Sequence, residues 1–354
     1  MKDLRLLIGG SSSFFFHLQE FSNTLNNLGI ESKLVFDADY SDGFPGRKIG
    51  KWFQTGKKFT KLIDEYKPDA ILIDRQRHFG IDSLKAGIPL FVLLRGHYWS
   101  EIAWNKKTMY KSFPRRIALR QWDKFGKEIF DGATAILPIC KYLEKITKKF
   151  VPGKPTNVFS EGVDASKWYN VEGLELKHPC VGLLQYANWW GKTSEMLVLK
   201  NVLQSMPDVN FYWVGDGPLR ERILSELNEY DNFHWLGKLQ YPDKVREYLS
   251  EIDVYALITG MDLAPLSLKE AQLMKKPVVA TNVGGNQEMM LDGKTGFLVE
   301  QGNHEQLIDK FSLLLEDKEL AKKMGEQGRK FIEETFNWEL VTKKFIKIAE
   351  SYLK

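Results

Sequence analysis

Two carboxylates, Asp262 and Glu270, stand eight positions apart in the sequence, with Pro265 between them. They follow an apolar run, residues 252–258, that is typical of a buried strand. Because proline is pre-shaped for the first position of a helix, Pro265 predicts a helix that begins near Leu266. The start of a helix presents unpaired N–H groups and the positive end of the helix dipole, and both suit a phosphate. Glu270 lies about one turn inside, where its carboxylate can accept hydrogen bonds from sugar hydroxyls, so the segment predicts a site for a nucleotide-sugar.

Short β-branched runs alternate with longer amphipathic stretches, which predicts parallel sheets covered by helices. In the first half of the chain, the predicted strands are residues 4–9, 32–37, 70–74, 90–95, 135–138 and 156–159. In the second half, they are residues 180–186, 209–214, 233–236, 254–258, 277–281 and 296–299. Helices are expected at residues 14–28, 194–205, 219–229, 244–250, 266–275 and 304–315.

This pattern predicts an α/β protein with two Rossmann-like, doubly wound domains that face each other across a cleft lined by the carboxyl ends of strands. A chain of 354 residues is comfortable for two domains, which we place at residues 1–165 and 173–337. Weak periodicity over residues 161–177 indicates the connection between them. We expect a last helix, residues 338–354, to pack back on the first domain.

The composition is that of an ordinary soluble globular protein, with 43% hydrophobic and 27% charged residues. We expect no leader peptide, and no apolar run approaches the roughly 18 residues that cross a bilayer. The two cysteines, Cys140 and Cys180, lack metal-ligand spacing. They indicate core residues of a reduced, cytoplasmic protein.

Positive charge is concentrated in the first half of the chain. Residues 101–154 hold 13 Lys and Arg against 5 Asp and Glu, and residues 47–61 hold 6 basic residues and no acidic one. Interleaved with these charges are the aromatic residues Trp52, Phe53, Phe59, Trp104, Tyr110, Phe113 and Trp122. The combination suits peripheral contact with an anionic membrane or a phosphate-bearing acceptor, although solvated helix faces would give the same charges. We expect no nucleic-acid partner, because no binding module accompanies the charge.

Five short segments resemble those of the retaining GT-B glycosyltransferases, in particular glycosyltransferase family 4 (group 1 type). They are SEGVD at 160–164, VGDGP at 214–218, ATNVGGNQE at 280–288, DGKTGFLV at 292–299 and FNW at 336–338. Asp262 and Glu270 stand where that family has two glutamates separated by seven residues, so Asp262 keeps the charge on a shorter side chain. Each segment alone is weakly specific, but five in order at family-like spacing are strong, while the first half of the chain matches loosely.

The resemblance implies a role for several residues of the second domain. Glu270 would bind the ribose of a nucleoside-diphosphate-sugar donor, and Asp262 would lie near the transferred hexose. Leu266 and Ser267 would offer backbone N–H groups to the diphosphate, and Lys192 would neutralise the same diphosphate as it leaves.

Further donor contacts are implied on neighbouring loops. The main chain of Lys238 and Leu239 would hold the base, and Gly284 and Gly285 would contact the donor from a tight turn. Gln185 stands near the place of the arginine that usually partners the phosphate lysine. A neutral amide stabilises less charge, so this departure calls for another cation.

The first domain would contribute through its strand ends. His97 occupies the position of a histidine that approaches the donor sugar, and Arg95 is the candidate for the missing cation. In the first loop, Gly10 and Ser13 would lie near the phosphates, although three serines and three phenylalanines leave the register there open. A further departure is Pro265, which stands where a glycine is common and removes one N–H donor.

The resemblance thus implies a sugar transfer from a UDP- or GDP-sugar to a hydroxyl acceptor, either a saccharide or a lipid-linked glycan, with retention of configuration. It implies no metal ion and no cofactor beyond the donor, and the departing phosphate would take the proton of the acceptor. Two alternatives stay open: a nucleotide-sugar epimerase of the same architecture, and a non-catalytic nucleotide-sugar-binding partner. A dehydrogenase is not supported, because Arg220 stands where the pattern G-x-G-x-x-G needs its last glycine.

Overall fold

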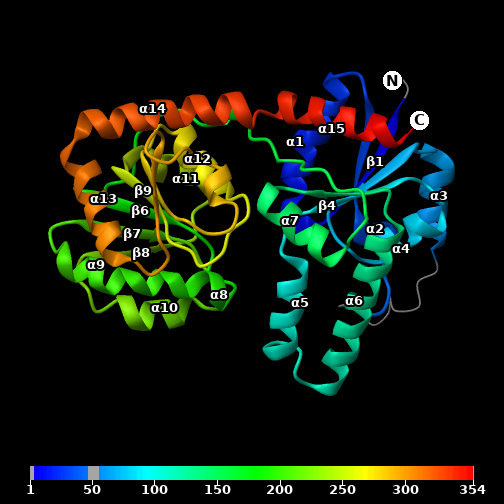
Figure 1. The fold of residues 1–354 in the computed structure, drawn as a ribbon, viewed down its shortest axis with the longest axis horizontal. Helices are drawn as coiled ribbons and strands as arrows, with labels where there is room; N and C mark the ends of the chain where they lie inside the picture. Colours follow the sequence, from blue (N-terminus) through cyan, green and yellow to red (C-terminus); the bar gives the residue numbers. More distant parts are fainter. Residues whose placement is uncertain (1–3, 47–55, 354) are drawn as a thin grey trace. The chain divides into compact units, whose positions relative to one another are not determined.

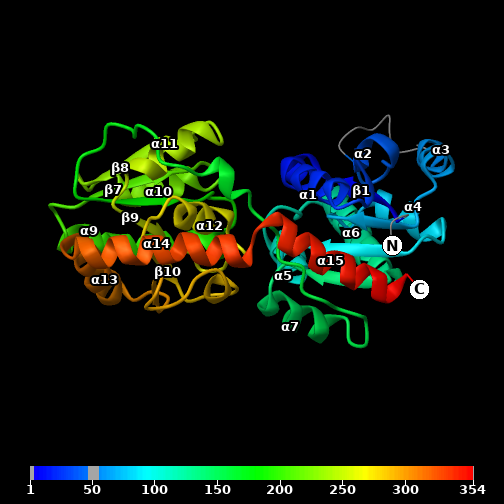
Figure 2. The same ribbon diagram turned by 90° about the horizontal axis from the view of Figure 1, so that it is seen from above.

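The computed structural model describes residues 4–46 and 56–353, without the side chain of Ser13. The chain forms two compact units (Figures 1 and 2). Unit 1 comprises Met1–Gly162 and Trp338–Lys354, and unit 2 comprises Val163–Asn337. Each unit contains one parallel sheet covered by helices, which confirms the predicted class of two Rossmann-like α/β domains.

The sheet of unit 1 has five parallel strands in the order β2-β1-β3-β4-β5. The strands are β1 (Arg5–Gly10), β2 (Glu31–Phe36), β3 (Ala70–Ile73), β4 (Leu90–Leu94) and β5 (Ala135–Pro138). The helices are α1 (Phe15–Asn27), α2 (Asp37–Tyr40), α3 (Lys57–Tyr66), α4 (His78–Lys85), α5 (Tyr98–Lys107), α6 (Phe113–Gly132) and α7 (Lys141–Phe150). Every residue of β3, β4 and β5 is buried, as expected for a parallel sheet with both faces covered.

The helix α15 (Trp338–Tyr352) completes unit 1, although unit 2 separates it from the rest of that unit in the sequence. Figure 1 shows α15 in red beside α1 in blue. Phe345 of α15 is fully buried and makes an edge-to-face contact with Phe21 of α1, with 5.1 Å between the ring centroids. Phe345 also packs against Phe159, so α15 is part of the core of unit 1.

The sheet of unit 2 has six parallel strands in the order β11-β10-β9-β6-β7-β8. The strands are β6 (Cys180–Leu184), β7 (Asn210–Val214), β8 (Phe233–Gly237), β9 (Val254–Leu257), β10 (Val278–Thr281) and β11 (Gly296–Val299). The helices are α8 (Trp190–Thr193), α9 (Leu199–Ser205), α10 (Arg220–Leu227), α11 (Asp243–Glu251), α12 (Leu266–Leu273), α13 (His304–Glu316) and α14 (Lys318–Thr335).

Several elements differ from the expectation, and the helices α2 to α8 have no counterpart among the predicted ranges. Residues 156–159 form no regular strand: Thr156 makes an isolated bridge with Ile136, and Asn157 and Phe159 donate to the carbonyls of Ile136 and Pro138 at 3.1 and 2.9 Å. Residues 163–172 belong to unit 2, where the almost fully buried side chain of Trp168 anchors them. The segment has few apolar repeats, so its sequence did not indicate that it is part of a domain. The sequence analysis missed α14, whose first turn is capped by the side chain of Asp317.

The basic aromatic stretches also separate into buried and exposed parts. Phe59 is buried and packs edge-to-face on Phe79, and Trp122 packs against His78, so neither belongs to an aromatic surface. Trp52 and Phe53 lie outside the described residues. Among the helices described, none is both long enough and apolar enough to cross a bilayer.

Candidate active site

The sheet of unit 2 changes winding direction between β6 and β9. The chain leaves β6 toward β7 on one side and later returns to β9 on the other. In open parallel sheets, ligands bind at such a switch point, outside the carboxyl ends of the strands. The loops that follow β6 and β9 are therefore the place to expect a ligand.

Lys192 and Asp262 meet at this switch point. The ammonium group of Lys192 in α8 forms an ion pair with the carboxylate of Asp262, which follows β9. Their side chains keep 25% and 14% of their surface exposed, so solvent and a ligand can reach the pair. The two loops also touch through their backbones, since the N–H of Gly260 donates to the carbonyl of Lys192 at 2.9 Å. A Cβ at Gly260 would lie only 2.2 Å from the carbonyl oxygen of Gly191, so only glycine allows this approach.

The helix α12 begins at Leu266, as the sequence predicts, with Pro265 as its N-cap residue. Among the described residues, no side chain caps its first turn. The N–H groups of Leu266 and Ser267 therefore stand at the positive end of the helix with no side-chain acceptor. The Ser267 hydroxyl accepts a hydrogen bond of 2.7 Å from the buried Tyr255, which fixes the first turn against β9.

Glu270 lies inside α12 and is only 3% exposed. Its Oε1 accepts a hydrogen bond of 3.0 Å from the hydroxyl of Tyr241. Tyr241 comes from the loop after β8, three positions beyond Lys238 and two beyond Leu239. Lys238 is exposed and Leu239 is half-buried. The hydrogen bond from Tyr241 ties the loop that was expected to hold the base to the helix that was expected to hold the ribose. Sequence reasoning missed Tyr241, and its only signal was its place just after the predicted base loop.

The glycine turn after β10 fixes the backbone of Asp262. Gly284 has a φ of +58°, and a Cβ there would lie 1.9 Å from the carbonyl oxygen of Asp262. The N–H of Gly285 donates to that same carbonyl at 2.9 Å. These glycines thus hold Asp262 in place, and a direct contact with a donor stays a prediction.

Gln185 joins β6 to β9 at the switch point. Its side-chain NH₂ group donates to the carbonyl of Ile258 at 2.9 Å, and the main-chain carbonyl of Gln185 accepts from the indole of Trp213 at 3.0 Å. The buried Oε1 of Gln185 and the buried hydroxyl of Thr193 have no hydrogen-bond partner among the described residues. Gln185 therefore has a structural role, and it leaves one buried acceptor in this part of the site.

The candidates from unit 1 have structural roles of their own. A Cβ at Gly10 would lie 2.8 Å from Leu18, so tight packing alone explains the glycine. His97 is the N-cap of α5, and its Nδ1 accepts from the N–H of Ser100 at 3.2 Å. Burial lowers the pKa of His97, which keeps the ring neutral and suited to this cap. Ser13 lies in the 3-10 helix Ser12–Phe14, and its side chain is outside the described part of the structure.

Arg95 belongs to a buried ionic cluster at the carboxyl edge of the unit 1 sheet. Its side chain is 6% exposed, and it pairs with Glu161 and, at 3.8 Å, with Asp74. None of its nitrogens makes a hydrogen bond of good geometry within the described residues. Asp74 in turn accepts from the N–H and the hydroxyl of Ser11, at 3.0 and 2.8 Å. Two carboxylates thus already match the charge of Arg95, contrary to the expectation that it would be available to a phosphate.

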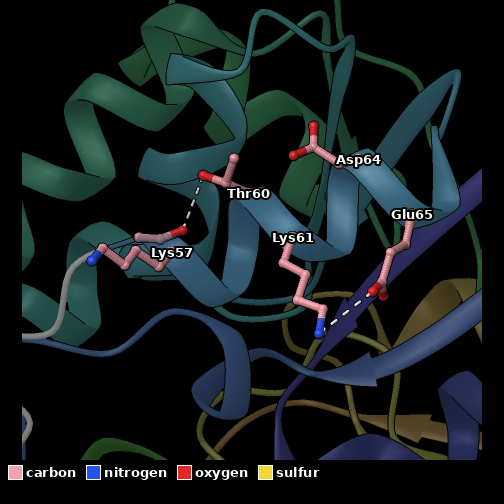
Figure 3. A pocket seen from close by; sticks show the side chains of 6 residues that line it. Lys57, Thr60, Lys61, Asp64 and Glu65 are labelled. Carbon is pink, nitrogen blue, oxygen red and sulfur yellow. Dashed lines mark hydrogen bonds and ion pairs between the residues drawn. The ribbon is translucent and has the colours of Figure 1, made fainter.

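One further feature of the surface carries no predicted site residue. A shallow hollow on α3, lined by Gly56, Lys57, Thr60, Lys61, Asp64 and Glu65, is shown in Figure 3. In it Lys61 pairs with Glu65 at 3.7 Å and Thr60 bonds back to the Gly56 carbonyl, which are contacts within one exposed helix.

Cys180 has polar neighbours that its sequence spacing did not indicate. His178 lies between Asp253 and Glu251, 2.8 Å from each, and its Nδ1 is 3.7 Å from the sulfur of Cys180. The hydrogen bonds to Asp253 and Glu251 raise the pKa of His178, while burial raises the pKa of Cys180 to about 12. We interpret the group as a protonated histidine between two carboxylates, beside a neutral thiol.

Comparisons with known proteins show what the sequence and the fold are similar to. Residues 196–331 match the family model of the group 1 glycosyl transferases. N-acetyl-alpha-D-glucosaminyl L-malate synthase of Bacillus anthracis is 33% identical over 150 residues, which are 42% of this chain and 39% of that protein. The chain thus spans well under two thirds of the length of this relative.

The likeness to solved structures extends over nearly the whole chain. Sucrose-phosphate synthase from Thermosynechococcus elongatus superposes with a TM-score of 0.75 at 16% identity, covering 99% of both chains. Anabaena HepE, in complex with UDP and glucose, superposes with a TM-score of 0.69 at 16% identity, covering 98% of this chain and 99% of that one. The chain therefore has the two-domain GT-B fold, and residues 196–331 of its second unit are similar to the group 1 glycosyl transferases.

Proposed function

We propose that the protein is a glycosyltransferase that moves a sugar from a nucleoside-diphosphate-sugar to a hydroxyl acceptor. The observation that carries this proposal is the switch point of unit 2. There, an uncapped helix start, an accessible ion-paired lysine and a buried glutamate lie on neighbouring loops. A diphosphate, a departing negative charge and a ribose would find suitable groups at these three places.

The donor would lie along the carboxyl edge of the unit 2 sheet. Its diphosphate would accept from the N–H groups of Leu266 and Ser267, and Lys192 would neutralise it. Glu270, oriented by Tyr241, would accept from the ribose hydroxyls. The base would lie on the main chain of Lys238 and Leu239, the same loop that carries Tyr241.

Asp262 would lie nearest the transferred sugar. Its carboxylate already pairs with Lys192, and a donor diphosphate would share that lysine and release the carboxylate toward the sugar hydroxyls. The turn at Gly284 and Gly285 would keep Asp262 in place during this exchange. Contacts from His97, Gly10, Ser13 and Gln185 to the donor stay predictions.

We further propose family 4 chemistry, with retention of configuration and without a metal ion. The bond between the anomeric carbon and the phosphate oxygen breaks, and a bond from that carbon to the acceptor oxygen forms on the same face. The acceptor proton moves to the departing phosphate. Lys192 and the start of α12 stabilise the charge that develops on the diphosphate, a contribution that is typically worth about 3–4 kcal/mol for one well-placed group.

The donor and acceptor are proposed by class. A UDP- or GDP-sugar is the expected donor, and the Anabaena structure with UDP and glucose supports a uridine nucleotide as the first to test. The acceptor is proposed to be a saccharide or a lipid-linked glycan at the cytoplasmic side of a membrane.

The first experiment is thermal unfolding in the presence of UDP-, GDP- and ADP-sugars. A ligand at about 100 times its dissociation constant adds about 2.7 kcal/mol of stability, which raises the melting temperature by several degrees. Glu270→Gln should abolish the shift, while the exposed control Glu326→Gln should retain it. If no nucleotide-sugar shifts the melting temperature of the wild-type protein, the proposal is wrong.

Product analysis then separates the reaction from its alternatives. Proton NMR of the product should show the anomeric configuration of the donor, with turnover unchanged by a chelator. Isomerisation of the sugar without an acceptor would instead indicate an epimerase, and binding without turnover would indicate a non-catalytic partner.

A further inference from the structure

The helices α5 and α6 form a hairpin that extends away from the sheet of unit 1 (Figure 1). Its far end, residues 106–120, is the hairpin tip. Three apolar side chains of the tip are open to solvent: Phe113 is 76% exposed, Met109 55% and Ile117 39%. Phe113 is the most exposed large apolar side chain in the described part of the chain.

The hairpin tip is also strongly cationic. It contains six basic residues and no acidic one, and all six are exposed: Lys106, Lys107, Lys111, Arg115, Arg116 and Arg120. On α6, Phe113 and Ile117 are four positions apart, and Arg116 and Arg120 repeat the same interval beside them. Residues at this spacing lie on one side of a helix, so apolar and cationic groups face solvent together.

Apart from the buried Leu119, the side chains of the tip contribute little to the fold. Within the described residues, the ion pair of α6 lies outside the tip, between Lys127 and Asp123 at 2.9 Å. Within the tip, Arg115 donates to the carbonyl of Met109 at 3.2 Å and thereby closes the turn between the helices. Arg116 and Arg120, by contrast, project from the exposed surface of α6.

We propose that the hairpin tip docks the protein on a bilayer rich in anionic phospholipid. Met109, Phe113 and Ile117 enter the boundary between headgroups and acyl chains, and the six cationic side chains bind the phosphates around them. Nucleic acid would attract the same charges but would gain nothing from the three apolar groups. The docking rests on the proposed function for its purpose, because it would hold the enzyme at a surface that presents a lipid-linked acceptor.

The test is co-sedimentation of the full chain with vesicles, without any nucleotide-sugar. We expect binding to vesicles of equal parts phosphatidylglycerol and phosphatidylcholine, weakening with salt, and little binding to phosphatidylcholine alone. Each cationic side chain near an anionic surface is worth about fivefold in affinity, so Arg116→Gln with Arg120→Gln should reduce binding about 25-fold. The matched control, Lys322→Gln with Lys323→Gln on an exposed face of α14, should change it much less.

Phe113→Ser distinguishes insertion from simple charge attraction. It should lower vesicle affinity on the order of tenfold or more without changing the melting temperature, because the ring is exposed in the fold. Equal loss for the α6 and α14 charge pairs, or full binding by Phe113→Ser, would overturn the proposal. So would a solution dimer that Phe113→Ser dissociates, or tighter binding to a DNA duplex than to the anionic vesicles.

Failure here and failure of the proposed function are separable. Transfer to a soluble acceptor, or hydrolysis of the donor, can be measured without vesicles. Phe113→Ser should retain both activities at the wild-type rate, because the hairpin tip contains none of the proposed donor-binding residues.

Discussion

The carboxyl edges of the two sheets both carry ionic side chains, but they use them differently. In unit 1, Arg95 is enclosed by Asp74 and Glu161, and Asp74 already accepts the N–H of Ser11 at the end of β1. In unit 2, Lys192 and Asp262 remain partly exposed beside the start of α12, which no side chain caps. Two parallel sheets of one class thus give one edge whose charges are buried together and one edge whose charges remain accessible to a ligand.

The difference shows what turns a sheet edge into a binding site. A parallel sheet always gathers polar groups where its strands end, since loops and helix starts meet there. In unit 1, the carboxylate of Asp74 accepts from both the N–H and the hydroxyl of Ser11, so these donors of the loop after β1 are already satisfied. In unit 2, the donors at the start of α12 have no side-chain acceptor among the described residues, and we expect the sugar donor to supply one.

The largest expected effect is the loss of the buried cation in unit 1. Arg95→Met leaves Asp74 and Glu161 buried without their counter-charge, which should lower the free energy of unfolding by about 3–5 kcal/mol. Lys192→Met removes a partly exposed pair and should cost less than about 1 kcal/mol. Urea unfolding of both variants compares the two edges directly, and equal losses would remove the distinction between them.

For activity we expect the reverse order, with the change at Lys192 more damaging than the change at Arg95. Lys192→Gln should lower kcat by about 100- to 1000-fold, because the departing diphosphate loses its cation. The control is Lys200→Gln, which breaks another lysine–carboxylate pair of unit 2, that with Glu226, away from the switch point. Initial rates with saturating donor measure both, and comparable rates for the two variants would show that Lys192 has no role in the reaction.

The buried charge of unit 1 also predicts a pH dependence. Burial, reinforced by the charge of Asp74, raises the pKa of Asp37 to about 6, above its usual value near 4. The folded state therefore holds a proton that the unfolded state releases, and this group lowers stability as the pH rises from about 4 to 6. Asp37→Asn should remove this loss and raise the stability at pH 7 by up to about 3 kcal/mol.

Urea midpoints measured from pH 4 to 7 test this expectation. The gap between Asp37→Asn and the wild type should open over that range, while the exposed neighbour Asp39→Asn should show no gap. A gap that is the same at every pH would mean that the effect is not electrostatic.

The smallest effect concerns the orientation of Glu270. Tyr241→Phe removes one hydrogen bond to this carboxylate, which should cost about 1 kcal/mol of stability. A similar loss in donor binding, about fivefold, should appear in calorimetric titrations. Tyr230→Phe, which removes a tyrosine hydroxyl bonded to Gln204, is the control and should bind donor like the wild type.

Local patterns in the sequence predicted the fold well and the site in part. The start of α12 follows from Pro265, and eleven of the twelve predicted strands are present. Burial on both faces explains the apolar runs of the central strands, such as β3, β4 and β9. The twelfth, at residues 156–159, runs along β5 with backbone hydrogen bonds from Asn157 and Phe159, but it forms only an isolated bridge there and no regular strand. The charge-rich helix α14 was missed because three of the five residues on its buried stripe, Ala321, Gly325 and Gly328, are too small to stand out as apolar.

Contacts between distant residues could not be predicted from local patterns. Lys192 and Asp262 were both candidates, but they are 70 positions apart and nothing in the sequence pairs them. Arg95 looked available because its two carboxylate partners, Asp74 and Glu161, come from other parts of the chain. Tyr241 stands 29 positions before Glu270, and only the folded sheet brings their loops together.

The position of α15 has a consequence for how the protein is made. The aromatic face of unit 1 that receives Phe345, formed by Phe21, Phe91 and Phe159, is synthesised before unit 2, but its cover follows afterwards. At usual translation rates, a ribosome needs roughly 10–35 s to add Val163–Asn337. During that time the aromatic face of the nascent first unit lacks its cover, so the second unit can complete its fold before the first unit does.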